Sequence, residues 1–198
     1  MKILSAELHD QAFTPAQIPS SLDLAQVAVF GRSNVGKSSL LASMMQRKRL
    51  VKVSSKPGKT RGIFFYRVND QLLLVDLPGY GFSKAPKVMA DQWATLVEAY
   101  LDSDPGPALA LHLIDIRHPP TRDDLDVSRI LTSRGIPILV VATKADKLSK
   151  SQRLRSLSVI SGDMDVGKSS VIPVSAKDST LSPAPLWEAI TGRLKEGS

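Results

Sequence analysis

Eight consecutive residues, Gly31 to Ser38, have the types and spacing of a phosphate-binding loop. They read GRSNVGKS, which fits G-x-x-x-x-G-K-[ST] between an expected strand and an expected helix. The glycines let the backbone curl so that its N–H groups point at a phosphate, and the start of the helix adds its positive end. Lys37 then reaches the β- and γ-phosphate oxygens and Ser38 ligates Mg²⁺. The pattern predicts a nucleotide site.

The same pattern occurs a second time, as GDMDVGKS at Gly162–Ser169. Here an expected helix precedes the motif and an expected strand follows it, which is the reverse of the phosphate-binding order. Asp163 and Asp165 inside the loop would also repel phosphate. We therefore expect this copy to be a surface loop.

A phosphate-binding loop is shared by ATPases, kinases and GTPases, and three further motifs at expected strand ends separate these classes. Asp76 of DLPG can hold Mg²⁺ through water while the Gly79 N–H meets a γ-phosphate. Asp146 of TKAD can accept two hydrogen bonds from guanine, whose donor pair adenine lacks, with the Lys144 stem along the base. A backbone N–H in Ser175–Lys177 can donate to guanine O6. Each motif alone fits an ordinary turn, but together and in this order they predict guanine recognition.

The elements that position these motifs alternate along the chain. Expected strands lie at 2–8, 24–30, 62–68, 71–77, 108–116, 136–143 and 170–176, and expected helices at 38–46, 88–101, after Thr121, 149–160 and 185–195. Apolar strands that alternate with helices predict an α/β fold with a mostly parallel sheet of six to seven strands and helices on both faces. A tight turn at Asn69-Asp70 adds one antiparallel edge pair. Ligands of such sheets bind at the carboxyl ends of the strands.

Composition narrows the class of protein. The chain has 198 residues, 42% hydrophobic and 5% aromatic, and no cysteine. The absence of cysteine excludes disulfide scaffolds, Cys-ligated metals and thiol catalysis, and the low aromatic content disfavours a stacking platform for single strands. We found no apolar run that could cross a bilayer and no secretory signal, so we expect a cytoplasmic protein.

The net charge of +7 is concentrated in one segment. Residues 47–67 hold eight basic side chains and no acidic one, whereas the rest of the chain carries 18 basic and 19 acidic residues. Such a patch is typical of nucleic-acid binding, because phosphate neutralisation releases counterions. The alternative is a solvated loop that faces a bound anion.

The motifs together resemble the Ras-like P-loop GTPases of the translation-factor class and, more narrowly, the EngB (YihA/YsxC) family of bacterial ribosome-assembly GTPases. The resemblance covers about residues 22–195 and rests on GRSNVGKSSL (Gly31–Leu40), KPGKTRG with its aromatic follow-on (Lys56–Phe65), VDLPGYGFSKAP (Val75–Pro86), TKADK (Thr143–Lys147) and SA (Ser175–Ala176). It implies a three-layer P-loop GTPase fold, a single GTPase domain at 23–198 and an N-terminal extension, 1–22, packed on or pairing with it.

The resemblance also implies GTP and Mg²⁺ binding, association of a monomer with the large ribosomal subunit precursor through segment 47–67, and an indirect need for the protein in cell division and septation. Thr60 corresponds to the switch I threonine, which ligates Mg²⁺ only when γ-phosphate is present; otherwise it is a loop threonine. Asn34 corresponds to a position that holds K⁺ near the phosphates in potassium-stimulated relatives; otherwise it makes an Asx turn. Tyr80 stands where related enzymes have a water-positioning Gln, which implies slow intrinsic hydrolysis.

The site residues implied by these matches fall into three overlapping groups. The catalytic group is Lys37, Thr60, Gly79 and Asn34. The Mg²⁺ group is Ser38 and Thr60 directly and Asp76 through water. The nucleotide-binding group is Gly31, Arg32, Ser33, Asn34, Val35, Gly36, Lys37, Ser38, Ser39, Pro57, Gly58, Lys59, Thr60, Asp76, Leu77, Pro78, Gly79, Thr143, Lys144, Ala145, Asp146, Val174, Ser175 and Ala176.

Other polar residues have simpler interpretations. His112 lies within an apolar strand and is expected to be a core or sheet histidine, and Asp115 after it is expected to order a loop. Asp124 stands three positions after Thr121 in a capping pattern, and the pair Asp123-Asp124 is expected to need nothing beyond the dipole of the helix that it begins. An alternative to the GTPase switch is a guanine-nucleotide-sensing rRNA-binding module with negligible hydrolysis. A small-molecule kinase would need an Arg-rich lid, for which Arg153 and Arg155 are thin support.

Overall fold

One seven-stranded sheet organises the chain in the computed structural model, which describes residues 1–47, 50–51, 62–81 and 87–196. The strands are β1 (Ala6–Ala12), β2 (Ala25–Gly31), β3 (Ile63–Val68), β4 (Leu72–Asp76), β5 (Leu109–Asp115), β6 (Ile138–Thr143) and β7 (Val171–Pro173). Their order across the sheet is β1-β3-β4-β2-β5-β6-β7. The pairings among β4, β2, β5, β6 and β7 are all parallel, which confirms the mostly parallel sheet.

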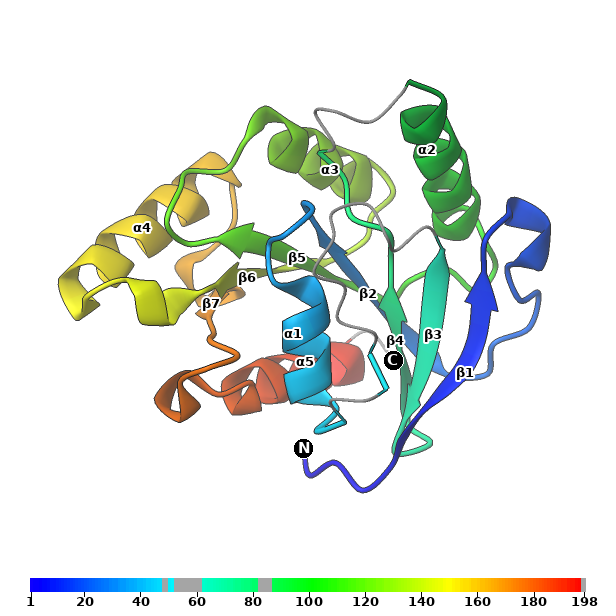
Figure 1. The fold of residues 1–198 in the computed structure, drawn as a ribbon, viewed down its shortest axis with the longest axis horizontal. Helices are drawn as coiled ribbons and strands as arrows, with labels where there is room; N and C mark the ends of the chain where they lie inside the picture. The colour runs from blue at the N-terminus through cyan, green and yellow to red at the C-terminus, as the bar shows by residue number, and fades with distance from the viewer. Residues whose placement is uncertain (48–49, 52–61, 82–86, 197–198) are drawn as a thin grey trace.

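Helices cover both faces of this sheet. They are α1 (Lys37–Met44), α2 (Lys87–Leu101), α3 (Arg122–Ser133), α4 (Lys150–Asp163) and α5 (Ala184–Glu196). α1 and α5 share a core with one face, and α2, α3 and α4 pack against the other (Figure 1). Successive residues of β2 alternate between these two cores, with Val27 and Val29 in one and Ala28 and Phe30 in the other. The three-layer arrangement predicted from the sequence is confirmed.

The antiparallel part of the sheet is larger than the hairpin alone. β3 and β4 pair antiparallel around Asn69 and Asp70, whose positive φ angles of 52° and 53° suit a tight two-residue turn. β1 then pairs antiparallel with β3 and forms the edge. We expected this strand at 2–8, four residues too early. Most of β1 is exposed, so it lacks the apolar pattern that places a buried strand.

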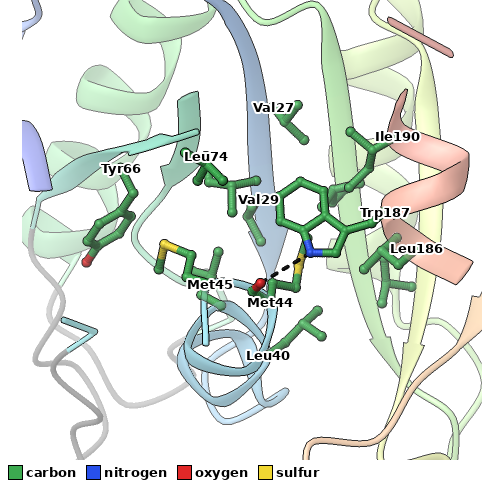
Figure 2. Packing of buried hydrophobic residues seen from close by; sticks show 14 of the residues in the cluster. Val27, Val29, Leu40, Met44, Met45, Tyr66, Leu74, Leu186, Trp187 and Ile190 are labelled. Atoms are coloured by element: carbon green, nitrogen blue, oxygen red, sulfur yellow. Dashed lines mark hydrogen bonds between the residues drawn. The ribbon is translucent and has the colours of Figure 1, made fainter. Parts of the chain in front are cut away.

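The hydrophobic core between the sheet and helices α1 and α5 holds α1, the helix that follows the phosphate-binding loop, in place. Trp187 of α5 is buried, and its indole Nε1 donates to the backbone carbonyl of Met44 over 3.2 Å (Figure 2). Leu40 and Ile190 pack in the same cluster beside Val29 of β2. Burying these side chains removes apolar surface from water, and the resulting contacts hold α1 firmly against the sheet.

The carboxyl ends of β2, β4, β5 and β6 lie at one edge of the sheet because these strands are parallel. The four motifs predicted to bind nucleotide follow these strands or, for Ser175, the short β7. β7 ends earlier than expected, and α4 continues three residues beyond the predicted end. No described helix is long and apolar enough to pass through a membrane.

Candidate guanine nucleotide site

The loop from Gly31 to Ser38 has the predicted strand–loop–helix context. β2 ends at Gly31 and α1 begins at Lys37, with Gly36 as its N-cap at a φ of 106°. A Cβ at Gly31 would lie 2.8 Å from Val35 Cγ1, so a side chain there would push the loop apart. Glycine is therefore required at both positions, by conformation at Gly36 and by close packing at Gly31.

The TKAD motif at the end of β6 supports this loop from the adjacent strand. The Thr143 hydroxyl donates to the Val35 carbonyl over 2.7 Å. The Lys144 Nζ donates to the Asn34 carbonyl over 2.8 Å and to Asp115 Oδ2 over 2.9 Å. These bonds turn the carbonyls of Asn34 and Val35 toward β6, so these two acceptor oxygens are already occupied by donors. Thr143 and Lys144 thus connect the loop to the TKAD motif, which is predicted to recognise the base.

Lys37 and Asp76 meet at the centre of the site. The Lys37 Nζ is in direct contact with Asp76 Oδ1, and both residues are buried. Ser38, on the next position of α1, adds a hydroxyl oxygen. Among the described residues, no group of three or more His, Asp or Glu side chains could hold a metal by itself. Oxygen donors of this kind fit Mg²⁺, which keeps several waters and takes further ligands from phosphates.

Asp146 is prepared to act as a charged acceptor. The Ser175 hydroxyl donates to Asp146 Oδ1 over 2.7 Å, and the Lys147 Nζ lies 3.3 Å from the other oxygen. The Ser175 hydrogen bond, followed by Lys147, lowers the pKa of Asp146 although partial burial opposes this. The backbone N–H of Ala145 donates to the Val174 carbonyl over 3.1 Å. The TKAD and SA motifs, which the sequence predicts to recognise guanine, are therefore adjacent.

The DLPG segment lies directly against the phosphate loop. A Cβ on Gly79 would be 3.2 Å from the Ser33 N and 3.3 Å from the Gly31 carbonyl oxygen. The Ser33 N–H donates to the Tyr80 carbonyl over 2.9 Å, and the Tyr80 N–H donates to the Gly31 carbonyl over 3.3 Å. The backbone around Gly79 is thereby fixed beside the loop. The Tyr80 side chain is buried, and its hydroxyl is engaged by α3 and β5.

Part of the predicted site lies outside the described residues. This holds for Pro57, Gly58, Lys59 and Thr60, and for most of the basic segment 47–67. Of that segment, Arg67 is described, and its guanidinium pairs with Asp70 over 2.7 Å.

The second copy of the phosphate-loop pattern, Gly162–Ser169, is a surface loop, as the sequence predicts. Gly162 and Asp163 form the end of α4, and a short 3-10 turn at Lys168–Ser170 leads into β7. Gly162, Gly167 and Lys168 are exposed. The order is α-helix, 3-10 turn, strand, so this copy does not lead into an α-helix as the first copy does.

One expectation about the buried polar residues needs correction. Asp124 forms the expected capping contact with Thr121, but it is 3% exposed and also accepts a hydrogen bond from Tyr80, so it does more than serve the helix dipole. His112 is a core histidine, as expected, but it also bonds Tyr80. Asp115, bound by Lys144 and Arg117, lies at the end of β5, and its contact with Lys144 links it to the phosphate loop, in agreement with its expected role of ordering a loop. The one sequence signal for the contact between His112 and Tyr80 was a histidine inside an otherwise apolar strand.

The sequence is similar to a large set of known proteins. A family model described as "50S ribosome-binding GTPase" matches residues 26–144. A protein of Caldanaerobacter subterraneus subsp. tengcongensis described as a probable GTP-binding protein EngB is 44% identical over 180 residues, 91% of this chain and 92% of that protein. An Exiguobacterium protein with the same description is 39% identical over 197 residues and the full length of both chains.

Solved structures show the same fold. The crystal structure of a probable GTP-binding protein engB has a TM-score of 0.68 at 23% identity and covers 87% of this chain and 98% of its own. The structure of Era in complex with MgGDPNP and a 16S ribosomal RNA fragment has a TM-score of 0.63 at 23% identity, covering 88% of this chain and 57% of Era.

Proposed function

Because this chain belongs to the EngB family of P-loop GTPases, which bind and hydrolyse GTP, we propose that it is a slow molecular switch that acts on an assembling large ribosomal subunit. The observation that carries the switch assignment is a convergence at one sheet edge. The phosphate loop, the Lys37–Asp76 pair, the DLPG backbone and the Asp146–Ser175 pair all lie at the carboxyl ends of neighbouring strands.

In this proposal the chain's own groups neutralise and orient the triphosphate. Lys37 and the loop N–H groups bind the β- and γ-phosphates, and the Gly79 N–H meets the γ-phosphate. Ser38 directly, Asp76 through water and Thr60 would hold Mg²⁺, which offsets the charge that develops on the phosphoryl oxygens. The sequence predicts Thr60 as the residue that couples switch I to the γ-phosphate.

Guanine selection rests on Asp146. Its carboxylate, oriented by Ser175, would accept hydrogen bonds from the N1–H and 2-amino groups of the base, and Ala176 would supply an N–H to O6. Hydrogen bonds to a charged acceptor contribute about 1.5–3 kcal/mol each. That difference is large enough to favour GTP over ATP by several orders of magnitude.

We further infer that intrinsic hydrolysis is slow. Tyr80 stands where related enzymes carry a water-positioning Gln, and its hydroxyl is already engaged by Asp124 and His112. Another group must then order the attacking water or stabilise its transition state. Asn34 is exposed on the phosphate loop with a φ of 65° and is our candidate for holding K⁺ there.

The ribosomal partner is supported by charge and by family. The basic segment 47–67 carries the whole net charge of the chain, and it contains Thr60, so a nucleotide-dependent change in this segment would alter its hold on rRNA. The family model carries a description as a 50S ribosome-binding GTPase. We propose that a cytoplasmic monomer binds the precursor of the large subunit through this segment, and that loss of the protein disturbs septation indirectly.

Co-sedimentation tests the partner. Purified protein would be centrifuged with large or small ribosomal subunits, with GDP or a non-hydrolysable GTP analogue, at 50 and 200 mM salt. We expect binding to large subunits that is stronger with the GTP analogue and falls steeply with salt. Equal binding to both subunits with either nucleotide would contradict the proposal.

A further inference from the structure

Residues 76–81 are here called the switch II segment. This segment contacts the phosphate loop, and it also contacts α2, α3 and β5 on its other side. The Trp93 indole Nε1 of α2 donates to the Pro78 carbonyl over 2.7 Å. The Trp93 and Tyr80 rings meet edge to face, with centroids 6.1 Å apart and planes at 68°. One side chain of α2 thus contacts the residues on both sides of Gly79.

The second fastening is a polar junction in the core. The Tyr80 hydroxyl donates to Asp124 Oδ1 over 2.6 Å and lies 2.7 Å from the His112 Nε2. Tyr80, His112 and Asp124 are 5%, 0% and 3% exposed. Because a phenol has one proton and that proton goes to Asp124, the His112 Nε2 carries the hydrogen and donates to the phenol oxygen. The junction is therefore directional, from β5 through the switch II segment to α3.

Asp124 is shared between this junction and the start of α3. Its Oδ2 accepts from the Thr121 N–H over 2.7 Å and from the Thr121 hydroxyl over 2.6 Å, which forms the capping box. The Oδ1 oxygen remains for Tyr80. The position of the tyrosine ring is consequently fixed relative to the first turn of α3, which is itself an ordered element.

These contacts determine where the Gly79 backbone lies. On one side Tyr80 exchanges backbone hydrogen bonds with Gly31 and Ser33 of the phosphate loop. On the other side Trp93 and Asp124 hold Pro78 and the tyrosine ring. Gly79 sits between them, with the Ser33 N 3.2 Å from where its Cβ would be. A small displacement of Trp93 or Asp124 would move the Gly79 N–H out of reach of a γ-phosphate. The contacts between the phosphate loop and a β-phosphate would not change.

We propose that Trp93 and Asp124 are positioning residues that hold Gly79 for γ-phosphate recognition, and so set how strongly the protein distinguishes GTP from GDP. This inference rests on the proposed role of the Gly79 N–H. Neither residue needs to touch nucleotide. Their effect is to pre-organise a backbone N–H donor for one phosphate group.

The test is the ratio of affinities for a non-hydrolysable GTP analogue and for GDP, measured by fluorescent-nucleotide titration with Mg²⁺ in the full-length protein. We expect Trp93→Phe and Tyr80→Phe each to weaken binding of the GTP analogue about fivefold or more, the effect of losing one ordinary hydrogen bond, with GDP affinity changed less than twofold. Asp124→Asn should act in the same direction. A purely structural role would lower both affinities together or leave both unchanged.

Two controls match these variants. Trp187→Phe removes an indole hydrogen bond to a backbone carbonyl on the opposite face of the sheet. Thr121→Ala removes the hydroxyl that donates to Asp124 Oδ2, while it keeps the backbone N–H donor and leaves Tyr80 its acceptor. Both should lower the thermal midpoint and keep the affinity ratio. If Trp93→Phe changes the ratio no more than Trp187→Phe does, the positioning proposal is overturned.

Gly79→Ala separates this inference from the function on which it rests. If Gly79→Ala reduces the preference for the GTP analogue while the Trp93 and Asp124 variants do not, γ-phosphate recognition stands and the positioning proposal fails. If Gly79→Ala itself leaves the ratio unchanged, the γ-phosphate role fails and the inference fails with it.

Discussion

The buried His112 should make the protein less stable as the pH falls through the mildly acidic range. The ring is fully buried in β5, and its Nδ1 has no hydrogen-bond partner among the residues that the structure describes. Protonation would place an unpaired N–H donor and a charge in an apolar strand. Burial therefore lowers the pKa of His112 from 6.5 to about 4, although the nearby Asp124 carboxylate opposes this.

The size of the effect follows from the two pKa values. Between pH 6.5 and about 4 the unfolded chain binds a proton at His112 that the folded chain does not, so the free energy of unfolding decreases as pH falls. Integrated from pH 7 to pH 5, the difference is about 2 kcal/mol. This is a large share of the stability of an ordinary domain.

Urea unfolding, followed by tryptophan fluorescence at pH 7, 6, 5.5 and 5, measures this directly. His112→Gln keeps a donor for the Tyr80 oxygen but cannot titrate, so it should lose about 2 kcal/mol less than the wild type over this range. His9→Gln is the matched control on the exposed strand β1 and should retain the wild-type slope. Equal slopes for His112→Gln and the wild type would refute the reasoning.

Three substitutions test the nucleotide site. Asp146→Asn should weaken GTP binding at least about 100-fold and favour XTP, because guanine loses a charged acceptor; unchanged GTP affinity in a titration would contradict the guanine assignment. Gly31→Ala should lower the thermal midpoint and nucleotide affinity together, since its Cβ would lie 2.8 Å from Val35 Cγ1 and 3.1 Å from Leu113 Cβ; a wild-type melting curve would show that the loop relaxes freely. Asn34→Gly, which tolerates the φ of 65°, should remove potassium stimulation of hydrolysis while sparing GDP binding, and persistent stimulation would exclude Asn34 as the K⁺ ligand.

The parts of the fold that carry strong local signals could be predicted from the sequence. β2, β4 and β5 are almost wholly buried and apolar for most of their length, so all three strands were easy to locate, as were the motifs that follow β2 and β4. The pairing of Asn69 and Asp70 in a hairpin turn follows from residue type alone. β1 was misplaced because an exposed edge strand has no such run.

The junction behind the switch II segment could not be predicted because it depends on tertiary contacts. Tyr80, His112 and Asp124 come from a loop, a strand and a helix, separated by 32 and 44 positions from Tyr80 to its two partners. Asp124 has a sufficient local explanation in the capping box with Thr121, which conceals its second partner. Trp93 likewise fits a packing position on α2, and only the structure shows its hydrogen bond to Pro78.

The most direct test of the switch is GTP hydrolysis by the purified protein in potassium or sodium buffer, with and without large ribosomal subunits. We predict a slow basal rate that rises with potassium, with the subunits or with both, because Tyr80 is committed to the core and another group must complete the transition state. A rate near zero under every condition, with tight GDP and GTP binding intact, would contradict a hydrolytic switch and identify a guanine-nucleotide-sensing RNA-binding protein.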